Sequence, residues 1–134
     1  MEEDGMGIDG ARGAALAQLP CFILATADDR GQCDCSYRGR APRDDGGFDP
    51  LVAMPGPAEL VFPDYSGNAM FNSLGNLMVN DGISLLFPGS EDGLWTRIDG
   101  RARIVDDPRP WASLWPSAQR CVVVSVTAVH RPTE

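Results

Sequence analysis

Residues 21–37 read CFILATADDRGQCDCSY, which is the pattern of two β-strands joined by a short turn. The apolar and β-branched run at residues 21–26 predicts the first strand, and DDRG at residues 28–31 supplies turn-forming residues that reverse the chain. Residues 33–37 form the returning strand. Because side chains of a strand alternate between its faces, one face should carry Cys33, Cys35 and Tyr37 and the other Asp34 and Ser36.

Similar strand patterns recur after this hairpin, at residues 51–54, 59–62, 83–87, 94–105 and 121–129, with a bulge expected at Gly100. Short helices are predicted at residues 11–18 and 110–114. A further helix is predicted where apolar residues recur at spacings of three and four, namely Met70, Phe71, Leu74, Leu77 and Met78. About six strands at intervals of about ten residues favour an antiparallel barrel and argue against βαβ units.

The length fits one domain. With 134 residues, of which 43% are hydrophobic, the chain can form one core, and we predict a single domain over residues 1–134. This domain comprises an N-terminal helical segment, residues 1–19, and a barrel, residues 20–130. A domain of this size buries only about two-thirds of its unfolded surface, so it gains stability from a partner. Dimerisation is therefore plausible from size alone.

The charge balance argues against nucleic acid as a partner. The formal net charge is −8, and the acidic residues are scattered along the chain. Binding nucleic acid requires a basic stripe that neutralises phosphates. Arg38, Arg40 and Arg43 lie close together in the sequence, however, and predict a local positive site on an otherwise acidic molecule.

No membrane span or signal peptide is apparent in the sequence, so we expect a cytoplasmic protein without a membrane partner. The four cysteines are expected as reduced thiols. Cys33 and Cys35 have no second pair of ligands, so we predict buried small side chains there and no metal site. His130 has no nucleophile paired with it by motif, and we interpret it as a surface histidine.

One segment carries a specific resemblance. Residues 62–77, FPDYSGNAMFNSLGNL, resemble the signature of one branch of the pyridoxamine 5′-phosphate oxidase-like, FMN-binding split-barrel family. GQCDCSYRG at residues 31–39 is similar to the family's hairpin strand, and WTRIDGRARI at residues 95–104 looks like a later strand. The resemblance covers about residues 20–106. It implies an antiparallel six-stranded split barrel that forms a homodimer, with FMN bound at the dimer interface.

The residues of this match suit a phosphate. A polar loop that leads into a helix exposes backbone N–H groups and the positive end of the helix dipole. By resemblance, the FMN phosphate belongs here, beside Ser36 and Arg38, with Trp95 and Arg97 as candidates to line the ring. No catalytic residue is identified. The predicted cofactor-binding set is Ser36, Tyr37, Arg38, Gly39, Asp64, Tyr65, Ser66, Gly67, Asn68, Asn72, Trp95 and Arg97.

The functional interpretation keeps several alternatives. Ala69 and Met70 stand where the vitamin-processing oxidases of the family carry an Arg-Lys pair, so oxidation of pyridoxamine phosphate is not expected. The first hypothesis is an FMN-dependent oxidoreductase acting on an unidentified small molecule. The others are a deazaflavin-dependent variant, a non-catalytic module for flavin, deazaflavin or haem, and a cofactor-free barrel. For Trp95 and Arg97, a packing or interface role is the favoured alternative to lining the cofactor. Residues 40–49 are predicted as a mobile loop, either solvent-exposed or closing over a substrate.

Overall fold

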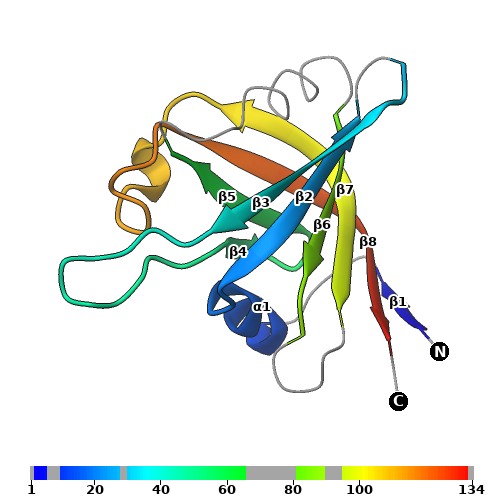
Figure 1. The fold of residues 1–134 in the computed structure, drawn as a ribbon, viewed down its shortest axis with the longest axis horizontal. Helices are drawn as coiled ribbons and strands as arrows, with labels where there is room; N and C mark the ends of the chain where they lie inside the picture. Colours follow the sequence, from blue (N-terminus) through cyan, green and yellow to red (C-terminus); the bar gives the residue numbers. More distant parts are fainter. Residues whose placement is uncertain (1, 6–9, 28–29, 66–80, 90–94, 133–134) are drawn as a thin grey trace.

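One curled antiparallel sheet forms the fold (Figure 1). The computed structural model describes residues 2–5, 10–27, 30–65, 81–89 and 95–132, and only the backbone of residues 2–5, 10–12 and 131–132. The strands are β1 (Glu2–Gly5), β2 (Cys21–Ala27), β3 (Cys33–Gly39), β4 (Ala53–Gly56), β5 (Glu59–Asp64), β6 (Gly82–Phe87), β7 (Thr96–Val105) and β8 (Arg120–Pro132). Their order is β3-β2-β6-β7-β8-β5-β4, and β1 pairs with β8. Because β3 and β4 stand at opposite ends of this order, the barrel is split along one side, as predicted.

The strand count differs from the prediction. Eight strands are present in the described part of the chain, against about six expected for the barrel; the seven segments with a strand pattern are all strands, and β1 is the addition. The residues of β1, EEDG, are polar and carry no strand signal, yet they pair with the end of β8. Helix α1 (Gly10–Ala17) confirms the predicted N-terminal helix. The predicted helix that contains Met70, Phe71, Leu74, Leu77 and Met78 lies outside the described residues. No helix among the described residues is long and apolar enough to cross a membrane.

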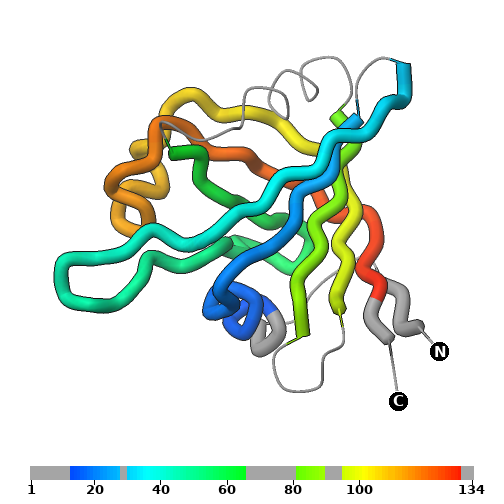
Figure 2. The backbone as a smooth tube through the Cα atoms, viewed as in Figure 1, coloured from blue at the N-terminus to red at the C-terminus, as the bar shows by residue number. Residues whose placement is uncertain are grey.

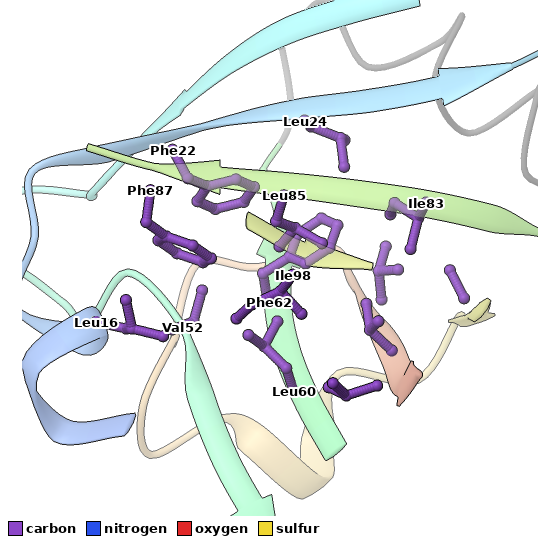
Figure 3. Close-up of a cluster of buried hydrophobic side chains, with 14 of the residues drawn as sticks. Leu16, Phe22, Leu24, Val52, Leu60, Phe62, Ile83, Leu85, Phe87 and Ile98 are labelled. Carbon is purple, nitrogen blue, oxygen red and sulfur yellow. The ribbon is translucent and has the colours of Figure 1, made fainter. Parts of the chain in front are cut away.

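The interior of the barrel is a continuous apolar core (Figure 3). Its centre is aromatic: the ring centroid of Phe22 lies 5.4 Å from that of Phe62 and 5.3 Å from that of Phe87. Every second residue of β2 and β6 contributes to this core or lies beside it, which is the alternation that the sequence predicted. Leu16 of α1 packs against the same core, so the helix covers one opening of the barrel.

Strand β5 and residues 121–124 of β8 are buried on both faces. Leu60 and Phe62 face the barrel interior, whereas Val61 faces the opposite side and belongs to a second apolar cluster with Trp115 and Cys121. Trp115 follows the 3-10 helix η1 (Arg109–Trp111), near the predicted short helix. Residues 109–118 therefore cover the outer face of β5 and of the first part of β8, which explains why the sequence there is continuously apolar.

A β-bulge interrupts the pairing of β7 with β8 at the predicted position. The register shifts between Asp99 and Gly100. A side chain at Gly100 would meet the backbone oxygen of Ser125, so only glycine allows the two strands to approach so closely there. The bulge changes which residues of β7 stand opposite β8 on the outer face.

Residues 40–49 form a projecting hairpin (Figure 2), where the sequence predicted an irregular mobile loop. The Arg40 guanidinium orders it by donating to the backbone oxygens of Asp49 at 2.8 Å and Phe48 at 3.1 Å. Arg43 pairs with Asp45 at 3.3 Å. Arg38 takes part in neither contact, because its guanidinium is buried on the interior side of the barrel, so the local positive site predicted from Arg38, Arg40 and Arg43 stays a prediction.

The four cysteines are free thiols, as expected, but two lie where they were not expected. Cys33 and Cys35 are exposed, not buried, because their face of the edge strand β3 points away from the core. Cys121 is fully buried, and burial, reinforced by the charge of Asp64, raises the pKa of its thiol to about 11.

Candidate anion site

The structure divides the predicted site residues between two faces of the sheet. Ser36, Arg38 and Asp64 lie on the side of the barrel interior, and Tyr37 and the residues of β7 lie on the outer side. Alternation along β3 causes this division, because Arg38 follows Tyr37 directly. Four predicted residues, Ser66, Gly67, Asn68 and Asn72, lie outside the described residues.

Arg38 and Asp64 come together from two strands that are not neighbours in the sheet. Each side chain belongs to a residue that is only 5% exposed. Arg38 is near the end of β3 and Asp64 is the last residue of β5, so the two charges meet across the split barrel. Their charges interact, and Asp64 also forms an ion pair with Arg120, whose Nε lies 3.3 Å from Asp64 Oδ2.

The charges in this cluster are incompletely satisfied. Within the described part of the chain, Nε and Nη2 of Arg38 and Oδ1 of Asp64 are buried and have no hydrogen-bond partner. Burial lowers the pKa of Arg38, and the Asp64 charge only partly opposes this effect. Burial likewise raises the pKa of Asp64 against the opposing charges of Arg120 and Arg38. Two guanidiniums with one carboxylate leave an excess positive charge, and buried N–H donors without acceptors favour an anionic ligand.

Tyr65 follows Asp64 in the chain, but its side chain packs against the second apolar cluster, that of Val61, Trp115 and Cys121. Its hydroxyl is buried without a hydrogen-bond partner among the described residues. Burial raises the pKa of Tyr65, and the nearby charges of Asp49 and Cys121 add to the effect. Tyr65 is therefore a neutral hydrogen-bond donor at every physiological pH.

The outer face carries a row of aligned residues. Tyr37 pairs with Ile23, Ile23 with Leu86, Leu86 with Arg97, and Arg97 with His130, from β3 through to β8. Tyr37 is 68% exposed. The sequence predicted that Trp95 and Arg97 share one face. In the structure Tyr37 also lies on the face of Arg97, whereas Arg38 lies on the opposite face. The remaining member of the predicted set, Gly39, ends β3 and is exposed.

Asp99 organises the polar end of this outer face. Its carboxylate accepts hydrogen bonds from Ser84 Oγ at 2.7 Å and from Arg97 Nη2 at 3.0 Å, and His130 Nε2 lies 3.1 Å away. Burial alone would raise the pKa of Asp99, but these hydrogen bonds and the neighbouring positive charges together hold it below its usual range. His130 is thus half-buried and bonded to Asp99, whereas the sequence suggested a surface histidine.

We expect Asp99→Asn to lower the free energy of unfolding by about 1–2 kcal/mol near pH 7, because it removes a charged acceptor with several donors. The pKa of Asp99 is lower in the folded state, so its contribution is present above the unfolded pKa of about 3.9 and is lost as the pH falls further. Urea titrations at neutral and acidic pH measure this. Asp81→Asn, which removes an exposed pair with Arg101, is the control and should change little. Equal losses at both pH values would contradict the assignment.

Sequence interpretation missed two residues of the anion site and its surroundings. Arg120 precedes the last strand and belongs to no motif, and Asp49 lies in a segment interpreted as an irregular loop. Both are charged residues that patterns of hydropathy place at the surface. Only the three-dimensional arrangement puts Arg120 beside Asp64 and buries Asp49.

The fold is a split barrel in which one buried arginine, Arg38, lies near the buried carboxylate of Asp64. A family model described as pyridoxamine 5′-phosphate oxidase matches residues 8–130, and the chain belongs to this family. No curated protein matches the chain in sequence.

Solved structures share the fold at low sequence identity. HupZ of Group A Streptococcus is 14% identical with a TM-score of 0.68, covering 92% of this chain and 94% of that one. An FMN-binding protein from Syntrophomonas wolfei is 8% identical with a TM-score of 0.69, covering 92% and 86% of the two chains. An F420 reductase is 16% identical with a TM-score of 0.52, covering 95% and 96%.

Proposed function

We propose that this chain is a flavin-dependent oxidoreductase that binds FMN through its phosphate at Arg38 and acts on an unidentified small molecule. The observation that carries the proposal is the buried guanidinium of Arg38, whose Nε and Nη2 lack acceptors among the described residues. Family membership and the similarity to an FMN-binding protein support a flavin-type ligand. The similarity to an F420 reductase supports a deazaflavin as the alternative.

Arg38 and Arg120 have complementary roles in this proposal. Arg38 donates to the phosphate through its two unpaired N–H groups, since a guanidinium suits bidentate recognition of such an anion. Arg120 holds Asp64 in place and adds positive charge. Ser36, on the same face as Arg38, contributes a hydroxyl, and the loop that contains Ser66, Gly67, Asn68 and Asn72 completes the site in the sequence-based prediction.

The chemistry comes from the bound group: a flavin transfers hydride or electrons between a donor and the substrate. The residues of the chain bind and orient it. No side chain is then required as an acid or base.

We propose further that the protein works as a homodimer, with Tyr37, Ile23, Leu86 and Trp95 in the interface. Tyr37 and Trp95 are large hydrophobic side chains left 68% and 44% exposed, and the row through Ile23 and Leu86 connects their strands. Aromatic residues are enriched in such interfaces. We also propose a reducing compartment, such as the cytoplasm, as the location of the protein, because all four cysteines are free thiols.

The test is the visible absorbance spectrum of the purified protein, with mass spectrometry of any small molecule released on denaturation. A flavin spectrum and a mass equal to FMN are the expected results. A Soret band would replace the proposal with haem binding. A colourless protein that takes up neither added FMN nor a deazaflavin would refute it.

A further inference from the structure

The buried cluster of Arg38 and Asp64 holds an acceptor without a donor as well as donors without an acceptor. Asp64 Oδ1 and the Nε and Nη2 atoms of Arg38 are buried, and none of these three atoms has a hydrogen-bond partner in the described part of the chain. The two side chains attract each other electrostatically, yet these atoms do not bond to one another. Buried polar atoms without partners destabilise a protein, so a ligand that satisfies both kinds of atom would bind best.

A fully ionised phosphate group would satisfy only the donors. Its oxygens accept hydrogen bonds from Arg38, but it has no proton to give to Asp64 Oδ1, and two negatively charged oxygens would then face each other. A phosphate that carries one proton fits both atoms, because its P–OH group donates while its other oxygens accept. The orphaned acceptor therefore distinguishes between two protonation states of the same ligand.

The charges of the cluster favour the same species. Arg38 and Arg120 contribute two positive charges and Asp64 contributes one negative charge, so a single further negative charge makes the cluster neutral. Cys121, the other titratable neighbour of Asp64, stays a neutral thiol, because burial raises its pKa to about 11. Residues 66–80 contain no acidic or basic side chain, so they add no charge. A doubly charged phosphate would leave an uncompensated negative charge beside the buried carboxylate.

We propose that Asp64 makes this site selective for a phosphate monoester that carries one proton, and that binding takes up this proton from solvent and holds it between Asp64 Oδ1 and a phosphate oxygen. The inference rests on the proposed binding of FMN at Arg38 and adds the species that is bound. The second pKa of a phosphate monoester is about 6, so FMN at pH 8 is almost fully ionised and gains the proton on binding. Burial raises the pKa of Asp64 against the charges of Arg120 and Arg38, which favours sharing of the proton.

The first test is isothermal titration calorimetry of the full chain with FMN at about pH 8, in buffers that differ in ionisation enthalpy. We expect uptake of about one proton per FMN, and an affinity that falls about tenfold per unit between about pH 7 and 9. Asp64→Asn should take up almost none, because its amide donates to the fully ionised phosphate. Asp81→Asn, which removes an exposed carboxylate paired with Arg101, is the matched control and should retain the wild-type uptake.

The second test needs no variant and uses riboflavin 5′-sulfate. Its sulfate ester carries one negative charge, as a singly protonated phosphate does, but it has no proton to donate to Asp64. At about pH 6 it should bind to the wild-type protein at least about tenfold more weakly than FMN, because Asp64 Oδ1 stays without a donor.

The outcomes separate this inference from the proposed function. FMN that binds to the wild type without uptake of a proton would overturn the inference and leave FMN binding intact. Equal affinity for the two flavin esters, or undiminished uptake by Asp64→Asn, would overturn it as well. A protein that does not bind FMN at all would refute the proposed function, and this inference with it.

Discussion

Replacing Arg38 with methionine should weaken FMN binding by about ten- to a hundredfold while leaving the fold as stable as before, or more stable. Methionine keeps much of the length and apolar contact of the side chain but removes the two buried N–H donors that lack acceptors. In the ligand-free protein the buried guanidinium of Arg38 destabilises the fold, because burial disfavours its charged form and lowers its pKa. Fluorescence quenching of FMN measures the affinity, and urea titration of the ligand-free protein measures the stability.

The control for this experiment is Arg101→Met, which removes an exposed guanidinium paired with Asp81. Its FMN affinity and stability should match those of the wild type. If Arg38→Met instead binds FMN normally and loses stability, Arg38 is a structural residue of the Asp64 cluster and the phosphate binds elsewhere. If both variants lose affinity equally, general electrostatic attraction explains the effect.

Truncation of Trp115 to alanine should lower the free energy of unfolding by about 3–5 kcal/mol. The residue is 1% exposed and is the largest member of the apolar cluster outside the barrel, against Val61 and Val123. Its removal leaves a cavity and deprives the backbone oxygen of Pro50 of its donor. Denaturant unfolding followed by circular dichroism measures the loss.

Trp95→Ala is the control for Trp115, since the same side chain there is 44% exposed and should contribute less than about 1 kcal/mol in the monomer. Trp115→Phe gives a second measurement if the alanine variant does not fold. This variant retains most of the apolar volume. Its free energy of unfolding should fall by about 1–3 kcal/mol, because the backbone oxygen of Pro50 loses its hydrogen-bond donor. A loss for Trp115→Phe no greater than that for Trp95→Ala would show that the cluster contributes little.

Local pattern was sufficient to predict the hairpin of β2 and β3 and the faces on which Cys33 and Tyr37 lie. These features depend on alternation and turn chemistry, which act over a few residues. The bulge at Gly100 was predictable for the same reason, because a glycine inside a long strand signals a close backbone approach. The family resemblance added the split-barrel topology, which no local pattern carries.

Burial of charged residues was not predictable. Arg38, Asp49 and Asp64 are each at least nine-tenths buried, although their residue types are mostly exposed in proteins. Their burial depends on strands and segments distant in the sequence, such as β5 packing beside the end of β3. The hairpin at residues 40–49 escaped detection because its order depends on Arg40 and backbone carbonyls, not on a hydrophobic period.

Strand β8 gives the assembly of this molecule a fixed order. It pairs with β1, β5 and β7, so it alone joins the run β3-β2-β6-β7 to the pair β5-β4 among the described strands. Residues 120–132 are synthesised after every other strand described here. Until they leave the ribosome, β5 and β7 present unpaired edges, which are sites of misassociation. Closure therefore waits for translation of β8, and the distant pairings it requires make that closure slow.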